Sequence, residues 1–374
     1  MIGLIKRIFA FILLFIIFTV QADALSEDDV SAECAAVISV QSGRVVFGKN
    51  ENQKHSMAST TKIMTSLLAV ESGKLQSEIK VTDSMVQVEG TSMGLMGGDS
   101  VSLRELVYGM LLPSGNDAAN VTALYLGGNI ESFVKMMNER GQEIGMVNTS
   151  FVTPSGLDDE NHYSTACDMA LLGREAVKNP EFLKICSSSK ATLTYGNPPY
   201  ERTLYNHNRL LGSYDGCLGI KTGFTKKSGR CLVTYARRNG VGLVAVTLND
   251  KNDWYDHRQM LDYGFSVVQT EEVIPELPET VDVAGGEKGT ALVKAESLFI
   301  EKGTEKVEYR YILPKFLYAP VNSGDVAGEV QAYSDGVLIQ SVPVTVCEDI
   351  KIKRVEIKPE EKSVLQKIKE FFHG

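Results

Sequence analysis

Two side chains that could do chemistry together lie three positions apart, at Ser59 and Lys62. The residues that follow are apolar and recur at helical spacing: Ile63, Met64, Leu67 and Leu68. This pattern predicts a helix that begins here, with Ser59 as its N-cap. Because residues three apart share one helix face, the hydroxyl and the amine should project together. A hydroxyl beside an unprotonated amine is a nucleophile with a base in reach, so we hypothesise that Ser59 is acylated and that Lys62 takes its proton.

The Ser-x-x-Lys spacing alone is weak evidence for catalysis, because a serine so placed can simply cap a helix or lie on a solvated face. The spacing occurs four times in the chain, at Ser59, Ser77, Ser132 and Ser187. Two further motifs, each present once, favour the first occurrence: Ser114-Gly115-Asn116 and Lys221-Thr222-Gly223. The Ser114 motif lies in the break between two predicted helices, and the Lys221 motif lies at the end of a predicted strand.

These three motifs occur in the order that is typical of class A β-lactamases and penicillin-binding proteins, with Gly115 here in the place of Asp. Longer stretches resemble the serine D-alanyl-D-alanine carboxypeptidases, the low-mass penicillin-binding proteins: 57–74, 106–120, 145–157, 158–168 and 206–225. The resemblance implies a mixed α/β catalytic domain of the penicillin-binding/β-lactamase type over residues 28–268. It implies an enzyme, without metal or cofactor, that removes the terminal D-alanine from peptidoglycan stem peptides and is acylated by penicillin and other β-lactams.

The catalytic residues that we predict are Ser59, Lys62 and Ser114. Ser59 would attack the carbonyl between the two D-alanines, and Ser114 would relay a proton to the leaving amine. Lys62 must be neutral to act as the base, and a desolvated cleft shared with Lys221 would lower its pKa. Lys221 would also hold positive potential for an anionic substrate.

The substrate-binding residues that we predict are Asn116, Lys221, Thr222, Gly223 and Phe224. Asn116 should hold the substrate amide, and Thr222 resembles the family's contact to the substrate's terminal carboxylate. The backbone N–H groups of Ser59 and Phe224 are the expected oxyanion donors. The family's carboxylate-binding arginine does not align cleanly here, so Arg258 is left out of the site.

Other functions fit the motifs less well. A β-lactamase would share Ser59 and Lys62 but needs a glutamate to activate the deacylating water, and we identify none. A non-catalytic wall-binding module would not need these residues intact. The Gly-x-Ser-x-Gly match at 90–94 lacks the following helix of a hydrolase nucleophile elbow. Five histidines without a His-Glu-x-x-His pattern argue against a metallohydrolase, and we interpret His162 and His207 as structural.

Composition sets outer bounds on the protein. With 374 residues, 43% of them hydrophobic, the chain is long enough for two domains. Its net charge of -9 argues against a general nucleic-acid binder, because binding to phosphates needs a surplus of basic residues.

The N-terminus has the pattern of a signal peptide over residues 1–24: a positive flank, the apolar run 8–20 and then Ala22-Asp23-Ala24. The alternative is an uncleaved anchor. We therefore expect export, to the outer face of the cytoplasmic membrane or beyond it. Export would permit disulfides, but the six cysteines form no C-x-x-C pair, and their spacing assigns no particular pairing.

The elements around the motifs follow from periodicity and turn signals. Predicted strands lie at 35–40, 44–47, 217–221, 230–236 and 241–248, the last two joined by the hairpin signal Asn239-Gly240. Predicted helices lie at 103–112 behind a capping box, and at 117–126, 130–144 and 164–177. Proline-rich alternation then predicts a small all-β domain at 271–355. The amphipathic tail 359–374 either lies in a membrane interface or packs on its own domain.

Overall fold

The computed structural model of the protein describes residues 25–304, 306–334, 337–354 and 371–372. The predicted signal peptide lies outside these ranges, as does all of the predicted tail except Phe371 and Phe372, whose side chains are exposed. Within the described ranges, no helix is both long and apolar enough to cross a membrane.

An antiparallel sheet of five strands forms the centre of the first domain, in the order β2-β1-β9-β8-β7. The strands are β1 (Cys34–Ser39), β2 (Val45–Lys49), β7 (Cys217–Thr225), β8 (Gly229–Arg238) and β9 (Val241–Leu248). Alternate residues of β1 belong to two different hydrophobic clusters: Ala36 and Ile38 to one, and Ala35 and Val37 to the other. The sheet is therefore covered on both faces, which explains why β1 and β9 are almost continuously apolar.

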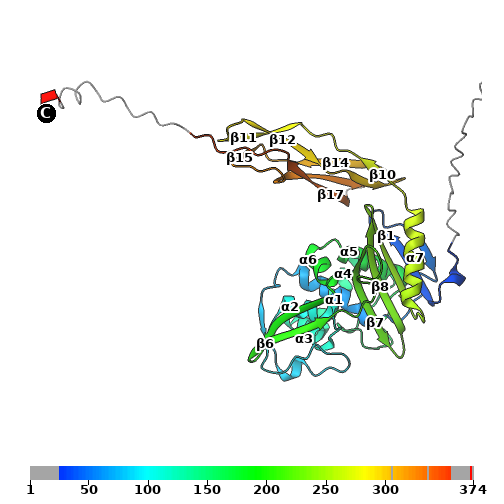
Figure 1. Ribbon diagram of the computed structural model, residues 1–374. Coiled ribbons are helices and arrows are strands. Elements are labelled where there is room, and N and C mark those ends of the chain that lie inside the picture. The colour runs from blue at the N-terminus through cyan, green and yellow to red at the C-terminus, as the bar shows by residue number, and fades with distance from the viewer. Residues whose placement is uncertain (1–24, 305, 335–336, 355–370, 373–374) are drawn as a thin grey trace, which may run out of the picture.

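Helices cover the two faces unequally (Figure 1). Helix α7 (Asp253–Val267) packs on one face through Met260 and Leu261. The other face carries α1 (Lys62–Glu71), α2 (Leu103–Leu111), α3 (Asn116–Gly127), α4 (Ile130–Ile144), α5 (Ala166–Ala176) and α6 (Pro180–Cys186). Helix α1 lies deepest among them, with Ile63, Met64 and Leu67 inaccessible to solvent. The serine and lysine of the first motif therefore stand at the start of the most buried helix.

Helix α6 was not predicted, and neither were two further features of this domain. A four-stranded sheet lies beside the helices, in the order β3 (Glu78–Lys80), β4 (Ser100–Ser102), β5 (Lys190–Gly196) and β6 (Pro199–Tyr205). Short 3-10 helices occur at η1 (Glu27–Asp29), η2 (Ala58–Thr61) and η3 (Asp83–Met85). The long segment 81–99 between β3 and β4 is otherwise irregular, and it forms one wall of the site described below.

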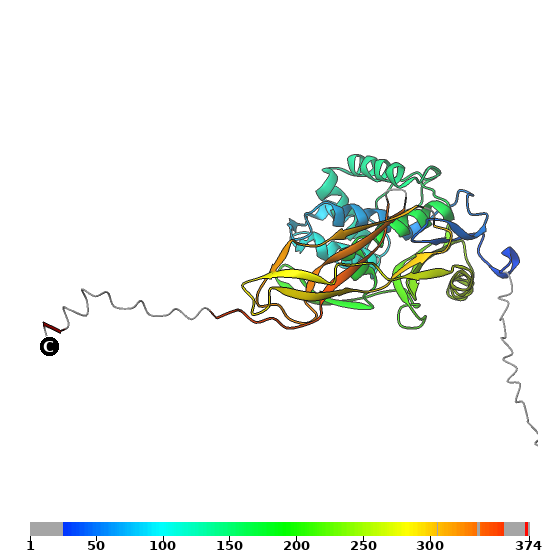
Figure 2. The same cartoon turned by 90° about the horizontal axis from the view of Figure 1, so that it is seen from above.

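The second domain is all β, as expected for the fold class. Six strands form one sheet, β14 (Val307–Ile312), β16 (Val326–Ser334), β17 (Val337–Val346), β12 (Thr290–Ala295), β11 (Thr280–Ala284) and β15 (Phe316–Tyr318), in that spatial order. Strands β10 (Thr270–Val273) and β13 (Leu298–Glu301) form a pair of their own. Figure 1 shows this domain beyond the end of α7, and Figure 2 shows its strands from above.

The two domains meet through polar contacts at the turn between β1 and β2. Glu301 is 4% exposed; it accepts a hydrogen bond from Ser39 Oγ at 2.6 Å and pairs with Arg44 at 3.0 Å. The amide of Gln41 donates to the Phe299 carbonyl at 2.8 Å and accepts from the Glu301 N–H at 3.0 Å. A buried carboxylate that is both paired and hydrogen-bonded favours a single docking geometry.

Candidate active site

The nucleophile candidate Ser59 lies in the 3-10 turn η2, and α1 begins only at Lys62. The prediction that Ser59 caps the helix is wrong, because Thr61 occupies that position and no side chain caps the helix. Ala58 has a φ of 47°, in the left-handed region, and a Cβ on Gly156 would lie 1.9 Å from the Ala58 carbonyl oxygen. The serine is thus held by tertiary packing on a strained turn rather than by helix propensity.

The amine of Lys62 is buried and has three oxygen partners. Nζ lies 2.8 Å from Ser59 Oγ, 2.7 Å from Asn116 Oδ1 and 2.7 Å from the Ser155 carbonyl oxygen. Burial, and then the charge of Lys221, hold the pKa of Lys62 well below its usual range, while Asp117 acts in the opposite direction. A neutral amine has two N–H groups and one lone pair. The amide and carbonyl oxygens can take the two N–H groups, which leaves the lone pair for the Ser59 hydroxyl.

Ser114 and Asn116 lie where α2 ends and α3 begins. Ser114 has a φ of 67° and is 5% exposed, and its carbonyl accepts a hydrogen bond from Thr91 Oγ1 at 2.6 Å. The amide group of Asn116 donates through Nδ2 to the Glu89 carbonyl at 2.7 Å, so its Oδ1 must face Lys62. The loop residues Glu89 and Thr91 therefore set the orientation of the second motif.

The third motif lies on β7, the edge strand of the central sheet. Lys221 is buried, and burial lowers its pKa to about 7. A Cβ on Gly223 would lie 3.1 Å from the backbone nitrogens of both Ser59 and Thr60. Glycine at this position lets β7 approach η2 closely, which brings the Phe224 segment beside the Ser59 backbone.

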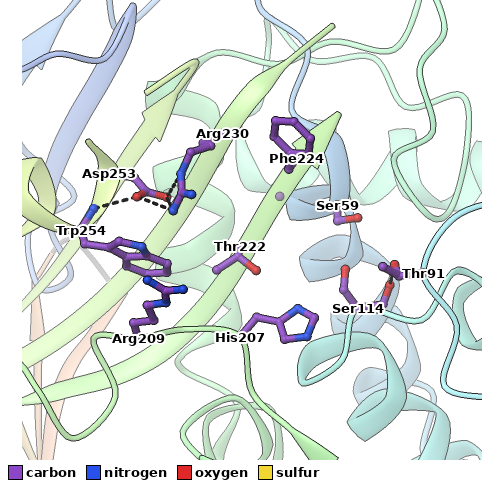
Figure 3. A pocket seen from close by; sticks show the side chains of 11 residues that line it. Ser59, Thr91, Ser114, His207, Arg209, Thr222, Phe224, Arg230, Asp253 and Trp254 are labelled. Atoms are coloured by element: carbon purple, nitrogen blue, oxygen red, sulfur yellow. Dashed lines mark hydrogen bonds and ion pairs between the residues drawn. The ribbon is translucent and has the colours of Figure 1, made fainter. Parts of the chain in front are cut away.

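A cleft of about 470 Å³ opens over these residues. Its lining comprises Ser59, Thr91, Ser114, His207, Arg209, Thr222, Gly223, Phe224, Arg230, Asp253 and Trp254. Figure 3 shows Ser59, Ser114 and Thr91 at one end and the two arginines and Trp254 at the other, with Thr222 and His207 between them. Lys62, Lys221 and Asn116 lie buried behind this surface rather than in it. The structure thus brings all the predicted site residues together around one opening.

The far end of the cleft contains residues that sequence reasoning missed. Arg230 is held by Asp253 through two N–H groups, with contacts between 2.7 and 3.0 Å. The guanidinium of Arg209, in contrast, has no hydrogen bond or ion pair within the described part of the chain, and it is exposed. Arg258 donates instead to Ser213, outside the cleft lining. The sequence did contain one signal for Arg209, because this residue lies in the stretch 206–225 that resembles the family and contains the third motif.

The two histidines that we interpreted as structural differ in their surroundings. The backbone N–H of Val152 donates to His162 Nδ1 at 2.9 Å, so the proton resides on Nε2, which lies 2.8 Å from Thr61 Oγ1. Burial lowers the pKa of His162 to about 4, against the opposing charges of Asp159 and Asp158. The neutral ring therefore supports the η2 turn from behind. His207 lies in the cleft lining, and burial followed by the charge of Lys221 lowers its pKa.

No cluster of three or more histidine, cysteine, aspartate or glutamate side chains among the described residues could hold a metal ion. All six cysteines are free thiols.

Comparisons with known proteins agree with this geometry. Residues 20–252 match the family model for D-alanyl-D-alanine carboxypeptidases, and residues 255–352 match the C-terminal domain of penicillin-binding protein 5. The chain is 32% identical over 340 residues to D-alanyl-D-alanine carboxypeptidase DacF of Bacillus subtilis, covering 86% of each chain. It is 32% identical to DacC of Escherichia coli K12, covering 86% of this chain and 84% of that one. The structure of penicillin-binding protein 5 from Haemophilus influenzae matches 86% of this chain and 98% of its own, at 31% identity and a TM-score of 0.61.

The pKa of His162 predicts an acid-sensitive stability. Because its folded pKa of about 4 lies below the ordinary value of 6.5, the unfolded chain takes up the proton first. The contribution is complete above pH 6.5 and is lost as pH falls toward 4, to a total of about 3 kcal/mol. Urea unfolding at pH 7 and pH 4.5 should show a smaller pH dependence for His162→Asn than for the wild type. His257 titrates in both proteins, so the difference between them isolates His162, and equal pH dependences would contradict the assignment.

Proposed function

We propose, from the premise that the chain belongs to the D-alanyl-D-alanine carboxypeptidase family and is a serine-type peptidase, that it hydrolyses peptidoglycan stem peptides through an acyl-enzyme on Ser59. The observation that carries this proposal is the distance of 2.8 Å between Lys62 Nζ and Ser59 Oγ, with the amine buried. Burial and the charge of Lys221 hold the pKa of Lys62 well below its usual range, which favours the unprotonated state that a general base requires.

The reaction follows from these positions. Ser59 Oγ attacks the carbonyl carbon between the two D-alanines and passes its proton to Lys62 Nζ. The backbone N–H groups of Ser59 and Phe224 stabilise the oxyanion, for which the close approach of Gly223 provides the geometry. The C–N bond then breaks, and the proton reaches the departing amine through Ser114, which lines the cleft beside Ser59. Water hydrolyses the resulting ester, with Lys62 again as the base.

Recognition of the substrate's terminal carboxylate can be assigned to the other end of the cleft. Thr222 offers a hydroxyl midway toward that end, and Arg209 offers a guanidinium at the end itself (Figure 3), with no partner among the described residues. Arg230 is less suited, because Asp253 already neutralises it. The positive potential of this end, with Lys221 behind Thr222, favours an anionic leaving group.

Penicillin and other β-lactams would acylate the same serine, because their strained amide and carboxylate can occupy the positions of the D-alanine pair. A β-lactamase remains the second candidate, since it would use the same serine and lysine. No glutamate lines the described part of the cleft to activate a deacylating water, which favours a long-lived acyl-enzyme.

We further propose that the enzyme acts outside the cytoplasmic membrane. The composition of residues 1–24 supports export, and the amphipathic pattern of residues 359–374 supports contact with a membrane surface. Stem peptides of the cell wall would be available to it there.

Replacing the nucleophile tests the whole proposal. Ser59→Ala should abolish both release of D-alanine from a pentapeptide mimic and covalent labelling by a fluorescent penicillin. Ser77→Ala, which removes the serine of a second Ser-x-x-Lys match, is the matched control and should retain both activities. Retained release in Ser59→Ala would refute the mechanism, and label that the wild type sheds within seconds would favour the β-lactamase.

Replacing the free guanidinium tests carboxylate recognition. Arg209→Ala should raise KM for the pentapeptide mimic about 10- to 100-fold with a smaller change in kcat, as expected for loss of a hydrogen bond to a charged group. Arg258→Ala, which removes an arginine outside the cleft lining, should leave KM within about twofold. A large effect in Arg230→Ala with none in Arg209→Ala would transfer the role to Arg230.

A further inference from the structure

Asp117 is a buried carboxylate that the proposed reaction does not use. It follows Asn116 in α3 and is 2% exposed. No lysine, arginine or histidine among the described residues forms an ion pair with it within 4.0 Å. A buried charge in this situation is stable only if hydrogen-bond donors surround it.

The donors come from the irregular segment that forms the cleft wall. Oδ2 of Asp117 accepts from Ser92 Oγ at 2.5 Å and from the backbone N–H groups of Gly94 at 3.1 Å and Leu95 at 3.0 Å. Oδ1 accepts from the N–H of Met93 at 2.9 Å and from that of Ala118 at 2.9 Å. One carboxylate therefore binds four consecutive residues of the turn 92–95, which satisfies backbone groups that no sheet or helix pairs.

The same turn is continuous with the residues that orient the second motif. Thr91 and Glu89 precede it and hold Ser114 and Asn116 through the contacts described above. The N–H of Asn116 also donates to the Thr91 carbonyl, at 2.7 Å. The wall and the motif are thus joined at two places, directly through residues 89–91 and indirectly through Asp117.

The packing around this carboxylate leaves no room for adjustment. A Cβ on Gly115 would lie 2.6 Å from Asp117 Oδ1 and 2.9 Å from the Met93 nitrogen. The glycine of the Ser-Gly-Asn motif is therefore needed for the carboxylate to reach the turn. An asparagine at position 117 would direct an NH2 group at backbone N–H donors, because an amide has only one accepting oxygen.

We propose that Asp117 is a positioning residue that holds the wall segment 89–95 against Asn116 and so fixes the orientation of Asn116 toward Lys62 and of Thr91 in the cleft. Its negative charge opposes the neutral state of Lys62, so an apolar residue would suit the base better. The carboxylate at this position is explained by the number of N–H donors that it accepts. This inference rests on the proposed acyl-enzyme at Ser59.

The test compares Asp117→Asn with a matched variant in the full-length protein. Active sites are first counted by burst titration with a fluorescent penicillin, and the acylation rate constant is then expressed per titrated site, which removes any effect of misfolded protein. Asp117→Asn should acylate about 10- to 100-fold more slowly, with a larger effect on kcat than on KM for a pentapeptide mimic. Acylation at the wild-type rate would overturn the proposal.

Asp168 offers the matched control. It is similarly buried, at 3% exposed, and accepts from the Asn148 N–H at 2.8 Å and from Thr149 Oγ1 at 2.7 Å, and none of these residues lines the cleft. Asp168→Asn should lower thermal stability while leaving the acylation rate per site within about twofold. An equal loss of rate in both variants would reduce the role of Asp117 to general stability and overturn the proposal.

Two further measurements keep the test decisive. If Asp117→Asn does not fold, Ser92→Ala is the second variant, because it removes one donor and keeps the carboxylate. Ser92→Ala should slow acylation about threefold at an unchanged melting temperature. An unchanged acylation rate would overturn the proposal. Hydrogen exchange at the amides of residues 93–95 needs no activity. Loss of their protection in the Asp117 or Ser92 variant supports the tether even if Ser59 is never acylated, and full protection refutes it.

Discussion

The burial of one amine is the constraint on which the rest of the structure depends. Moving a lysine ammonium out of water costs several kcal/mol, and burial accordingly shifts Lys62 toward the neutral amine by lowering its pKa. A neutral amine in turn needs partners for two N–H groups and one lone pair. Asn116, Ser155 and Ser59 supply them, and they come from three segments distant in sequence. The proposed activation of Ser59 therefore requires all three segments to be in place.

Each of these segments is held by backbone geometry that local preferences alone do not stabilise. Ala58 and Ser114 have positive φ angles, and Gly156 and Gly223 sit where a Cβ would meet the nucleophile turn. Such positions persist because the helices and the central sheet pack around them. Strain near the reacting groups is thus offset by the apolar core on both faces of that sheet.

Elements with strong local signals were predictable from sequence. Helix α4 occupies the predicted range 130–144, because an Asn129 cap, a regular apolar face and Gly145 define it locally. The β8–β9 hairpin forms at Asn239-Gly240, where positive φ angles suit these residues.

The prediction that Ser59 caps a helix was wrong for the opposite reason, since tertiary contacts impose a 3-10 turn there. The prediction that Ser59 and Lys62 lie together was not affected by that error, because a 3-10 turn also brings residues three apart onto one side. Arg209 and Trp254 could not be linked by pattern, because only the fold brings them to one cleft.

The contact between the domains lies at the opposite end of the central strands from the nucleophile. Ser39 and Gln41 stand at the β1–β2 turn, whereas Gly223 pairs with Cys231 near the start of β8. The polar contacts between the domains therefore do not touch the Ser59 turn directly. The route that does join the two ends is helix α7, because Asp253 and Trp254 at its start line the cleft and Val267 at its end leads into the second domain.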